Sequence, residues 1–190
     1  EKNRNGKLLR KRFPLYKSGM LLAEQLRSFD IDMVTPLINN NLINKNNLGF
    51  NKEMKASEEQ DLFLKICAIA TVVTIPKTLG VSTIREDSLT NKCREYWSIE
   101  RNKTLDDLEL ILKTEEFSTA IKKARIQSEY YKASYLASIG DFENVRKIMR
   151  SLFNKRNVFK FLYLISFSPP LWNFLHRRSV KIVFTDFLKI

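Results

Sequence analysis

Hydrophobic side chains recur at helical spacing through the second half of the chain. Over residues 116–139 they form one apolar stripe, which stops at Gly140, where glycine favours helix termination. Asp141 follows with a side chain suited to an N-cap, and apolar residues continue at helical intervals to Leu152. The pattern predicts two helices joined by a tight turn, an αα-hairpin.

Three more helices are predicted upstream. Leucines gather on one side of residues 18–28, and residues 58–70 are strongly apolar-periodic. The spacing is helical again from residue 88 to about residue 113. A break is expected near residue 103 in that region, because Thr104 followed by two aspartates has the character of a second N-cap.

Short strands are predicted between these helices. Residues 71–75 are rich in β-branched side chains and end at a proline, residues 79–84 follow after a short break, and residues 31–38 are a further extended stretch. Only five glycines and five prolines occur, too few for the turns of an all-β fold. We therefore expect an α+β fold, mainly helical, with two or three short strands followed by a helical C-terminal region.

The segment 158–176 is apolar on every side, and Pro169-Pro170 divides it into two short helices. It is too short to span a bilayer. Cations flank it within residues 155–181, so two interpretations stay open: a peripheral anchor on an anionic membrane, or a helix pair packed on the rest of the chain.

The net charge is distributed unevenly along the chain. The net charge of +12 comes from the two ends, since residues 1–17 carry +6 and residues 141–190 carry +7, whereas residues 18–140 carry −1. A uniformly basic nucleic-acid binder would have a different distribution, and no nucleic-acid-binding motif occurs, so we expect no nucleic-acid partner. Two cysteines without a secretory signal favour a reducing, cytoplasmic location.

Candidate chemistry lies at the start of the predicted helix 58–70. Ser57 is a good N-cap, and Glu58, Glu59 and Asp61 fall in the first turn, where carboxylates point toward whatever precedes the helix. A carboxylate held there could act as a general base toward a hydroxyl group. Ordinary stabilisation of the helix start is the alternative explanation, because acids are common in first turns.

This motif and its neighbours resemble a known family. Several spaced elements within residues 13–100 match, in order, the second half of the bacterial family-2 glycosyltransferases, which have the GT-A fold. The matching segments are Phe13-Pro14-Leu15-Tyr16, residues 31–36, Gly49-Phe50-Asn51, residues 58–64, Leu79-Gly80-Val81 and Ser88-Leu89-Thr90.

The resemblance implies transfer of a sugar from a nucleotide sugar to a hydroxyl of a glycan acceptor, with inversion, in surface glycan biosynthesis. By position, Glu59 would be the base, Glu58 and Asp61 would support the helix start or bind the acceptor, and Arg85 would contact the diphosphate. The family usually has Asp where Glu59 stands, so the longer side chain is a departure. The alternatives are a helical protein-interaction module without catalytic activity and a basic nucleic-acid-binding domain.

The resemblance also implies that this chain is a piece of a larger enzyme. Residues 1–104 would be the acceptor-side part of a GT-A domain and residues 105–190 a helical extension, with the nucleotide-binding half preceding them. The divalent metal, Mg²⁺ or Mn²⁺, would then have its ligands outside this chain. Asp30-Ile31-Asp32 matches the family's Asp-x-Asp metal motif in residue type but lies on the acceptor side, where the resemblance does not place that motif. We expect the 190-residue chain to be inactive by itself.

Overall fold

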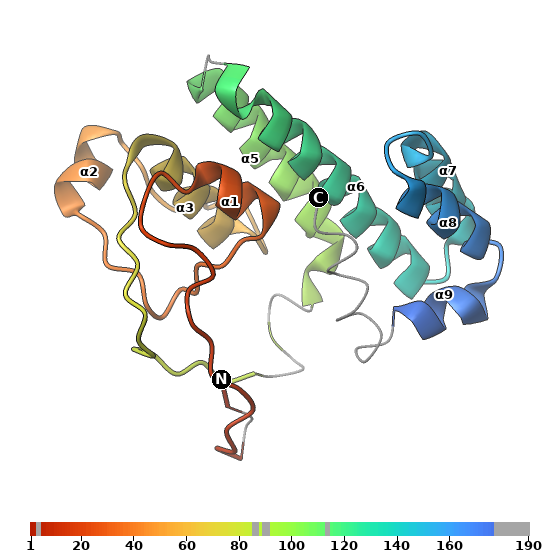
Figure 1. Cartoon of the computed structure of the whole chain (residues 1–190), viewed down its shortest axis with the longest axis horizontal. Helices are drawn as coiled ribbons and strands as arrows, with labels where there is room; N and C mark the ends of the chain where they lie inside the picture. Colours follow the sequence, from red (N-terminus) through yellow and green to blue (C-terminus); the bar gives the residue numbers. More distant parts are fainter. Residues whose placement is uncertain (3–4, 85–87, 89–91, 113–114, 177–190) are drawn as a thin grey trace.

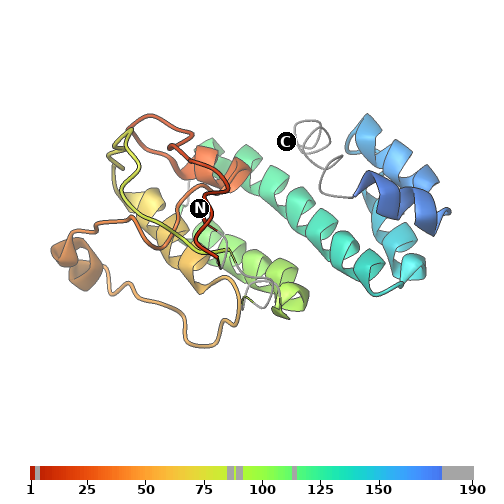
Figure 2. The same ribbon diagram turned by 90° about the horizontal axis from the view of Figure 1, so that it is seen from below.

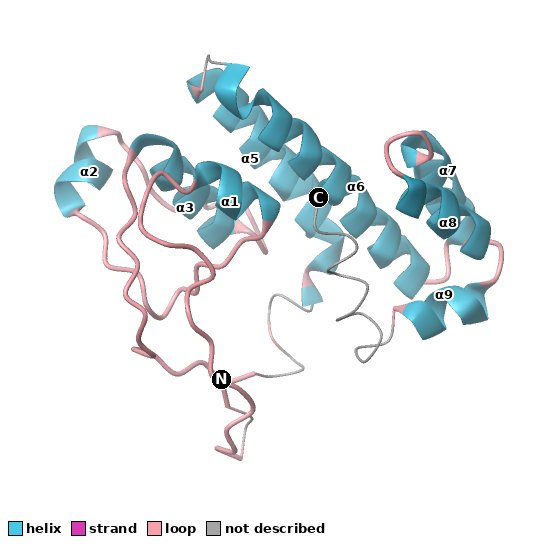
Figure 3. Ribbon diagram, viewed as in Figure 1, coloured by secondary structure: helices cyan, strands magenta, loops and turns pink. Residues whose placement is uncertain are grey.

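A computed structural model describes residues 1–2, 5–84, 88, 92–112 and 115–176. Helices account for 56% of the chain, and the described residues form no β-strand. Figure 3 shows the helices joined by loops throughout this part of the chain. The predicted fold class, an α+β half of a GT-A domain with two or three strands, is therefore wrong, and the described part of the chain is mainly helical.

Two long helices form the centre of the molecule. Helix α5 (Trp97–Ile111), preceded by the 3₁₀ turn η1 (Arg94–Tyr96), runs beside α6 (Ser118–Ser138), which follows the 3₁₀ turn η2 (Glu115–Phe117). Figure 1 shows this antiparallel pair crossing between the remaining helices, which lie on either side of it.

The first hydrophobic core lies where α1 (Leu22–Arg27) and α3 (Glu58–Ile69) pack against α5 and the first half of α6. Its buried members are Leu22, Leu26, Leu64, Cys67, Leu105, Leu108, Ile121 and Ala124. The short helix α2 (Asn40–Lys45), capped by the Asn39 side chain, contributes Leu42 and Ile43 to a smaller cluster on another side of α3.

The second core joins the end of α6 to the C-terminal helices α7 (Phe142–Leu152), α8 (Asn157–Ile165) and α9 (Pro169–Leu175). Gly140 has a φ of 84°, which fits the predicted helix stop, and the Asp141 side chain accepts a hydrogen bond from Asn144 N at 3.2 Å. Figure 2 shows α7–α9 gathered at the end of α6 away from α3. The αα-hairpin prediction is confirmed.

The predicted strands are extended segments with single bridges. Val72 pairs with Gly19 through two 2.9 Å hydrogen bonds, and Thr83 lies opposite Lys2. A strand needs a neighbour that continues the hydrogen-bonded ladder, and β-branched residues do not form one without that neighbour. The described chain offers no such neighbour to residues 71–75 or 79–84.

The predicted break near residue 103 is also wrong. Helix α5 continues through it, and Thr104 lies inside the helix with its buried hydroxyl bonded to Asp61 Oδ1 at 2.8 Å. The predicted helix 18–28 is shorter than expected, because Gly19 is held in an extended pairing with Val72. The division at residue 104 falls within α5 and stays a prediction.

Two leucines of α5 provide a test of the first core. Leu108 is fully buried, whereas Leu110 is 74% exposed on the same helix. We expect Leu108→Ala to lower the free energy of unfolding by about 2–5 kcal/mol, because it leaves a cavity. Leu110→Ala is the matched control and should change it by no more than about 0.5 kcal/mol. Denaturant unfolding measures both, and equal losses would contradict the described packing.

Candidate active site

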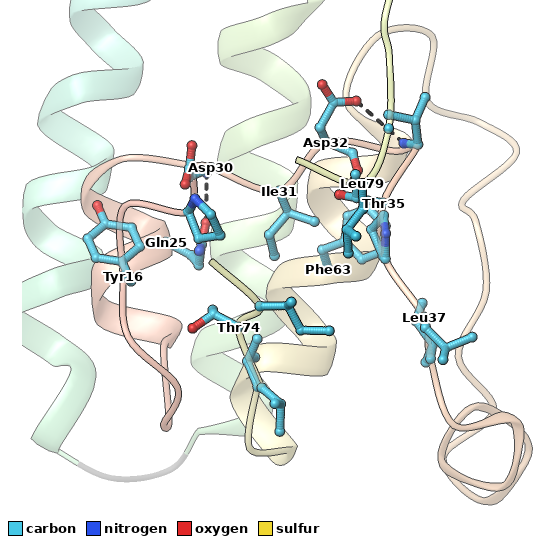
Figure 4. Close-up of a pocket in the computed structure, with 18 of the residues that line it drawn as sticks. Tyr16, Gln25, Asp30, Ile31, Asp32, Thr35, Leu37, Phe63, Thr74 and Leu79 are labelled. Carbon is cyan, nitrogen blue, oxygen red and sulfur yellow. Dashed lines mark hydrogen bonds between the residues drawn. The ribbon is translucent and has the colours of Figure 1, made fainter. Parts of the chain in front are cut away.

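A cavity of about 680 Å³ lies beside α3, within the size range of small-molecule sites. Its walls come from three loop segments, residues 12–16, 30–39 and 70–82, and from one face of α3. Figure 4 shows Asp30, Asp32 and Thr74 among the polar residues and Ile31 and Phe63 among the apolar ones. An apolar chamber with a few polar groups can hold a ligand and orient it.

Helix α3 presents Phe63, Ile66 and Cys67 to this cavity. These positions follow Glu59 at intervals of four, seven and eight residues, which place side chains on one face of a helix. Glu59 does not line the cavity, but it begins the helical face that does. The candidate base therefore lies one helical turn before the first α3 residue that lines the cavity, at the amino end of α3.

The carboxylate of Glu59 is half-buried, and no hydrogen bond or ion pair to it occurs among the residues that the structure describes. Burial raises the pKa of Glu59, and the negative charges of Glu58 and Asp32 raise it further. Asp32 itself lines the cavity. A carboxylate with a raised pKa and no cationic partner retains affinity for a proton, which is what a general base requires.

The Asp61 side chain is buried and bonded to other side chains of the fold. Its side chain is 1% exposed and accepts hydrogen bonds from Thr104 Oγ1 at 2.8 Å and from Lys65 Nζ at 2.9 Å. Lys65 also reaches Asp107 Oδ2 at 2.7 Å. The predicted support of the helix start by Asp61 agrees with this geometry, whereas acceptor binding by this buried carboxylate does not.

Helix α5 fixes the residues just before α3. The Glu100 carboxylate is buried and accepts hydrogen bonds from Lys55 N at 2.6 Å and from Ala56 N at 3.1 Å. Thr104, one turn further along α5, holds Asp61. Ser57 occupies the N-cap position as predicted, but its side chain makes no capping hydrogen bond. The turn before α3 is positioned by the two α5 side chains instead.

Glu100 and Thr104 were missed by sequence reasoning. The available signal was their four-residue spacing on the side of α5 that also carries Leu105 and Leu108, where a polar residue must find a buried partner. Glu58 has one buried carboxylate oxygen without a hydrogen-bond partner among the described residues. It therefore stands beside Glu59 as a second partly desolvated acid.

The remaining sequence candidates are Arg85 and the Asp30–Asp32 pair, and both aspartates line the cavity. Arg85 lies outside the described residues. Asp30 is paired with Arg12 Nη2 at 2.8 Å and accepts the Leu15 N–H at 2.7 Å. Within the described ranges, no group of three or more His, Cys, Asp or Glu side chains is placed to hold a metal ion.

Two further residues affect the chemistry and the shape of the cavity. Cys67 lines it, but burial raises the pKa of this thiol to about 11, so it stays protonated at neutral pH and is no nucleophile. Gly80 lets two loops of the wall approach each other, because a Cβ atom there would lie 3.0 Å from Val34 Cγ2. Hydrogen bonding and proton transfer by carboxylates are therefore the available chemistry.

Comparison with known proteins adds no family to this description. No protein-family model, curated protein or solved structure matches the chain. The resemblance to the family-2 glycosyltransferases stays a prediction.

The buried position of Asp61 predicts a large stability effect. Asp61→Ala removes the buried acceptor shared by Lys65 and Thr104, which keep Asp107 and the Glu100 carbonyl as their remaining partners, and we expect a loss of about 1–3 kcal/mol in the free energy of unfolding. Asp106→Ala removes an exposed aspartate paired with Arg125 and should cost no more than about 1 kcal/mol. Urea unfolding distinguishes them, and a small effect at Asp61 would contradict its structural role.

The environment of Glu59 predicts that replacing this residue raises the stability of the fold, whereas replacing Asp61 lowers it. The folded chain keeps a proton on Glu59 to higher pH than the unfolded chain, so ionisation of Glu59 lowers stability as pH rises above its ordinary pKa of 4.5. Glu59→Gln should therefore be more stable than wild type at pH 7, with the difference shrinking as pH falls toward 4.5 and largely gone below that pH.

Glu53→Gln is the control for this experiment. Its hydrogen bond and ion pair with Lys103 lower the pKa of Glu53, so its replacement should give no gain in stability at pH 7. Thermal unfolding of the three proteins between pH 3.5 and about 7.5 measures the effect. A pH-independent difference for Glu59→Gln would rule out titration of this carboxylate as its cause.

Proposed function

We propose that this chain is the acceptor-side part of an inverting sugar transferase and that Glu59 is its general base. Glu59 takes the proton of an acceptor hydroxyl as the oxygen attacks the anomeric carbon of a nucleotide sugar. The new glycosidic bond forms while the bond to the diphosphate breaks, and the nucleoside diphosphate leaves with the bonding electron pair. The reaction would belong to surface glycan biosynthesis.

One observation carries this proposal: a half-buried carboxylate without a cationic partner lies one helical turn before Phe63, which lines a ligand-sized cavity, and interacts with the charge of Asp32 in that lining. The other first-turn acids differ from it, since Asp61 is committed to Lys65 and Thr104. The wall of the cavity combines hydroxyl groups, including those of Tyr16, Thr35 and Thr74, with apolar surface. Such a mixture suits an acceptor sugar, which has hydroxyl groups around an apolar ring.

A second observation supports completion of the site by another segment of the protein. The extended segments 71–75 and 79–84 leave alternate apolar side chains uncovered, and these are Val73, Ile75, Leu79 and Val81, each at least 51% exposed. Extended backbone with uncovered apolar side chains is typical of an interface. The segment that binds the nucleotide sugar would pack here.

The cofactor and donor contacts are assigned to that other segment. A divalent metal, Mg²⁺ or Mn²⁺, would neutralise the diphosphate when bound. Its ligands are proposed to lie outside this chain, and Arg85 is the residue of this chain proposed to approach the diphosphate. None of the helices in the described part is both long enough and apolar enough to cross a bilayer. We place the reaction in the cytoplasm, next to the inner membrane face.

The test is Glu59→Gln in the whole protein that carries this chain. An amide keeps the size of the side chain but cannot accept the proton, so we expect sugar transfer to fall by about 10²–10⁴. Release of nucleoside diphosphate from uridine, guanosine and thymidine diphosphate sugars, with Mn²⁺ and glycan acceptors, measures turnover. Glu58→Gln should reduce turnover less, and Glu53→Gln should leave it unchanged. Wild-type turnover in Glu59→Gln would refute the assignment.

A further inference from the structure

Helices α8 and α9 have one apolar face buried and a second apolar face exposed. Val158, Phe159, Leu162, Ile165 and Trp172 belong to the second core. On the other side, five large hydrophobic residues are at least 43% exposed, and these are Phe161, Leu164, Phe167, Leu171 and Phe174. An amphipathic helix normally has polar residues on that side. The exposed apolar face therefore needs an explanation beyond packing.

Cations are interleaved with aromatic rings on the adjoining surface. Lys160 Nζ lies 5.8 Å from the centre of the Phe153 ring, and Arg146 Cζ lies 5.3 Å from that of Phe167. The Tyr163 ring connects them, with centroid distances of 5.7 Å to Phe153 and 5.3 Å to Phe167. The contacts join α7, α8 and the turn after α8 into one basic and aromatic surface, which with the exposed residues above we call the α8–α9 surface.

Positive charge predominates in this region. From residue 144 to residue 176 the sequence contains no aspartate or glutamate and six cations, which are Arg146, Lys147, Arg150, Lys155, Arg156 and Lys160. One of them, Lys147, forms an ion pair with Glu143 of α7 at 2.7 Å. An occupant of the α8–α9 surface must therefore be negatively charged and must also accept apolar side chains.

We propose that the α8–α9 surface binds an anionic membrane, lying in the interface with Leu164 and Phe167 inserted among the headgroups. Anionic lipid supplies both requirements, because the phosphate layer attracts the cations and the acyl boundary accepts the apolar side chains. Nucleic acid satisfies only the first. Base stacking needs open ring faces, and here a cation covers one face of Phe153 and one of Phe167, while Leu164 offers no stacking at all.

The packing of the helices makes this surface preformed. Trp172 is 1% exposed and contacts Phe142 edge to face at 6.3 Å, and Phe159 and Leu162 are fully buried against the second core. Membrane binding therefore requires no unfolding of α8 or α9. Both sequence-based interpretations of this segment thus apply to residues 155–176: one side of the helix pair packs, and the other is proposed to bind lipid. Residues 177–181 lie outside the described residues.

The experiment is co-sedimentation of the 190-residue chain with vesicles. We expect binding to vesicles of phosphatidylcholine with phosphatidylglycerol, little binding to pure phosphatidylcholine, and a decrease with added salt. Lys155→Gln with Lys160→Gln should weaken binding roughly 30-fold, since each cation near an anionic surface contributes about fivefold. Lys122→Gln with Lys123→Gln, two exposed lysines of α6, is the matched control for charge.

A second pair of variants tests the apolar contribution. Leu164→Ser with Phe167→Ser should weaken binding at least tenfold, because it removes apolar surface that the lipid would cover. Leu110→Ser with Ile139→Ser removes exposed hydrophobic residues elsewhere and should have no effect. Circular dichroism confirms that each variant is folded. Equal losses in both pairs, or unchanged binding in Leu164→Ser with Phe167→Ser, would overturn the proposal.

Other occupants give different outcomes. Tighter binding to a single-stranded oligonucleotide than to anionic vesicles, lost in the same variants, would make nucleic acid the partner and refute the membrane assignment. Dimerisation in size-exclusion chromatography that is abolished by Leu164→Ser with Phe167→Ser would make a second copy the occupant and would refute it too. Glu59→Gln should bind vesicles like wild type, so failure of this proposal is separable from failure of the transferase proposal.

Discussion

The candidate site depends on the hydrogen bonds by which side chains of α5 fix the start of α3. Glu100 binds the two N–H groups at residues 55 and 56, and Thr104 binds Asp61, so adjacent turns of one helix fix both sides of the helix start. The side chains of Glu100, Thr104 and Asp61 are themselves buried, so an unpaired polar group there would be costly. Glu59 lies between these two points. Its position one turn before the cavity lining follows from contacts made by its neighbours, while its own carboxylate has no hydrogen-bond partner among the described residues.

The elements that sequence reasoning located correctly are those with local determinants. Gly140 supplies the left-handed conformation that ends α6, and Asp141 caps α7 with its own side chain, so the hairpin is encoded within a few residues. The prolines at 169 and 170 occupy the first turn of α9, where a missing N–H does no harm. Helix α3 likewise begins directly after Ser57, as its apolar periodicity and first-turn acids indicated.

The features that sequence reasoning missed depend on partners far away in the chain. Thr104 has the local character of an N-cap, but Asp61, forty-three residues earlier, accepts its hydroxyl and keeps it inside α5. Residues 71–75 have the composition of a strand, yet a ladder requires a second segment, and among the residues that the structure describes only Gly19 forms a β-bridge with them. Of the candidate site, the first-turn acids could be read from the sequence. The cavity and the role of Glu100 could not, because loops distant in sequence create them.

Helix α6 connects the two surfaces for which functions are proposed. Ile121 and Ala124 belong to the core under the cavity, whereas Tyr130, Ala133 and Ala137 belong to the core under α8 and α9. A helix of 21 residues is about 30 Å long, and both of its ends are packed, so the cores cannot change their separation without breaking α6. A membrane bound at α8–α9 would therefore hold the cavity at a fixed distance from the lipid. An acceptor carried on a lipid would have to extend over that distance to bring its hydroxyl to Glu59, and this requirement would select acceptors by length as well as by chemistry.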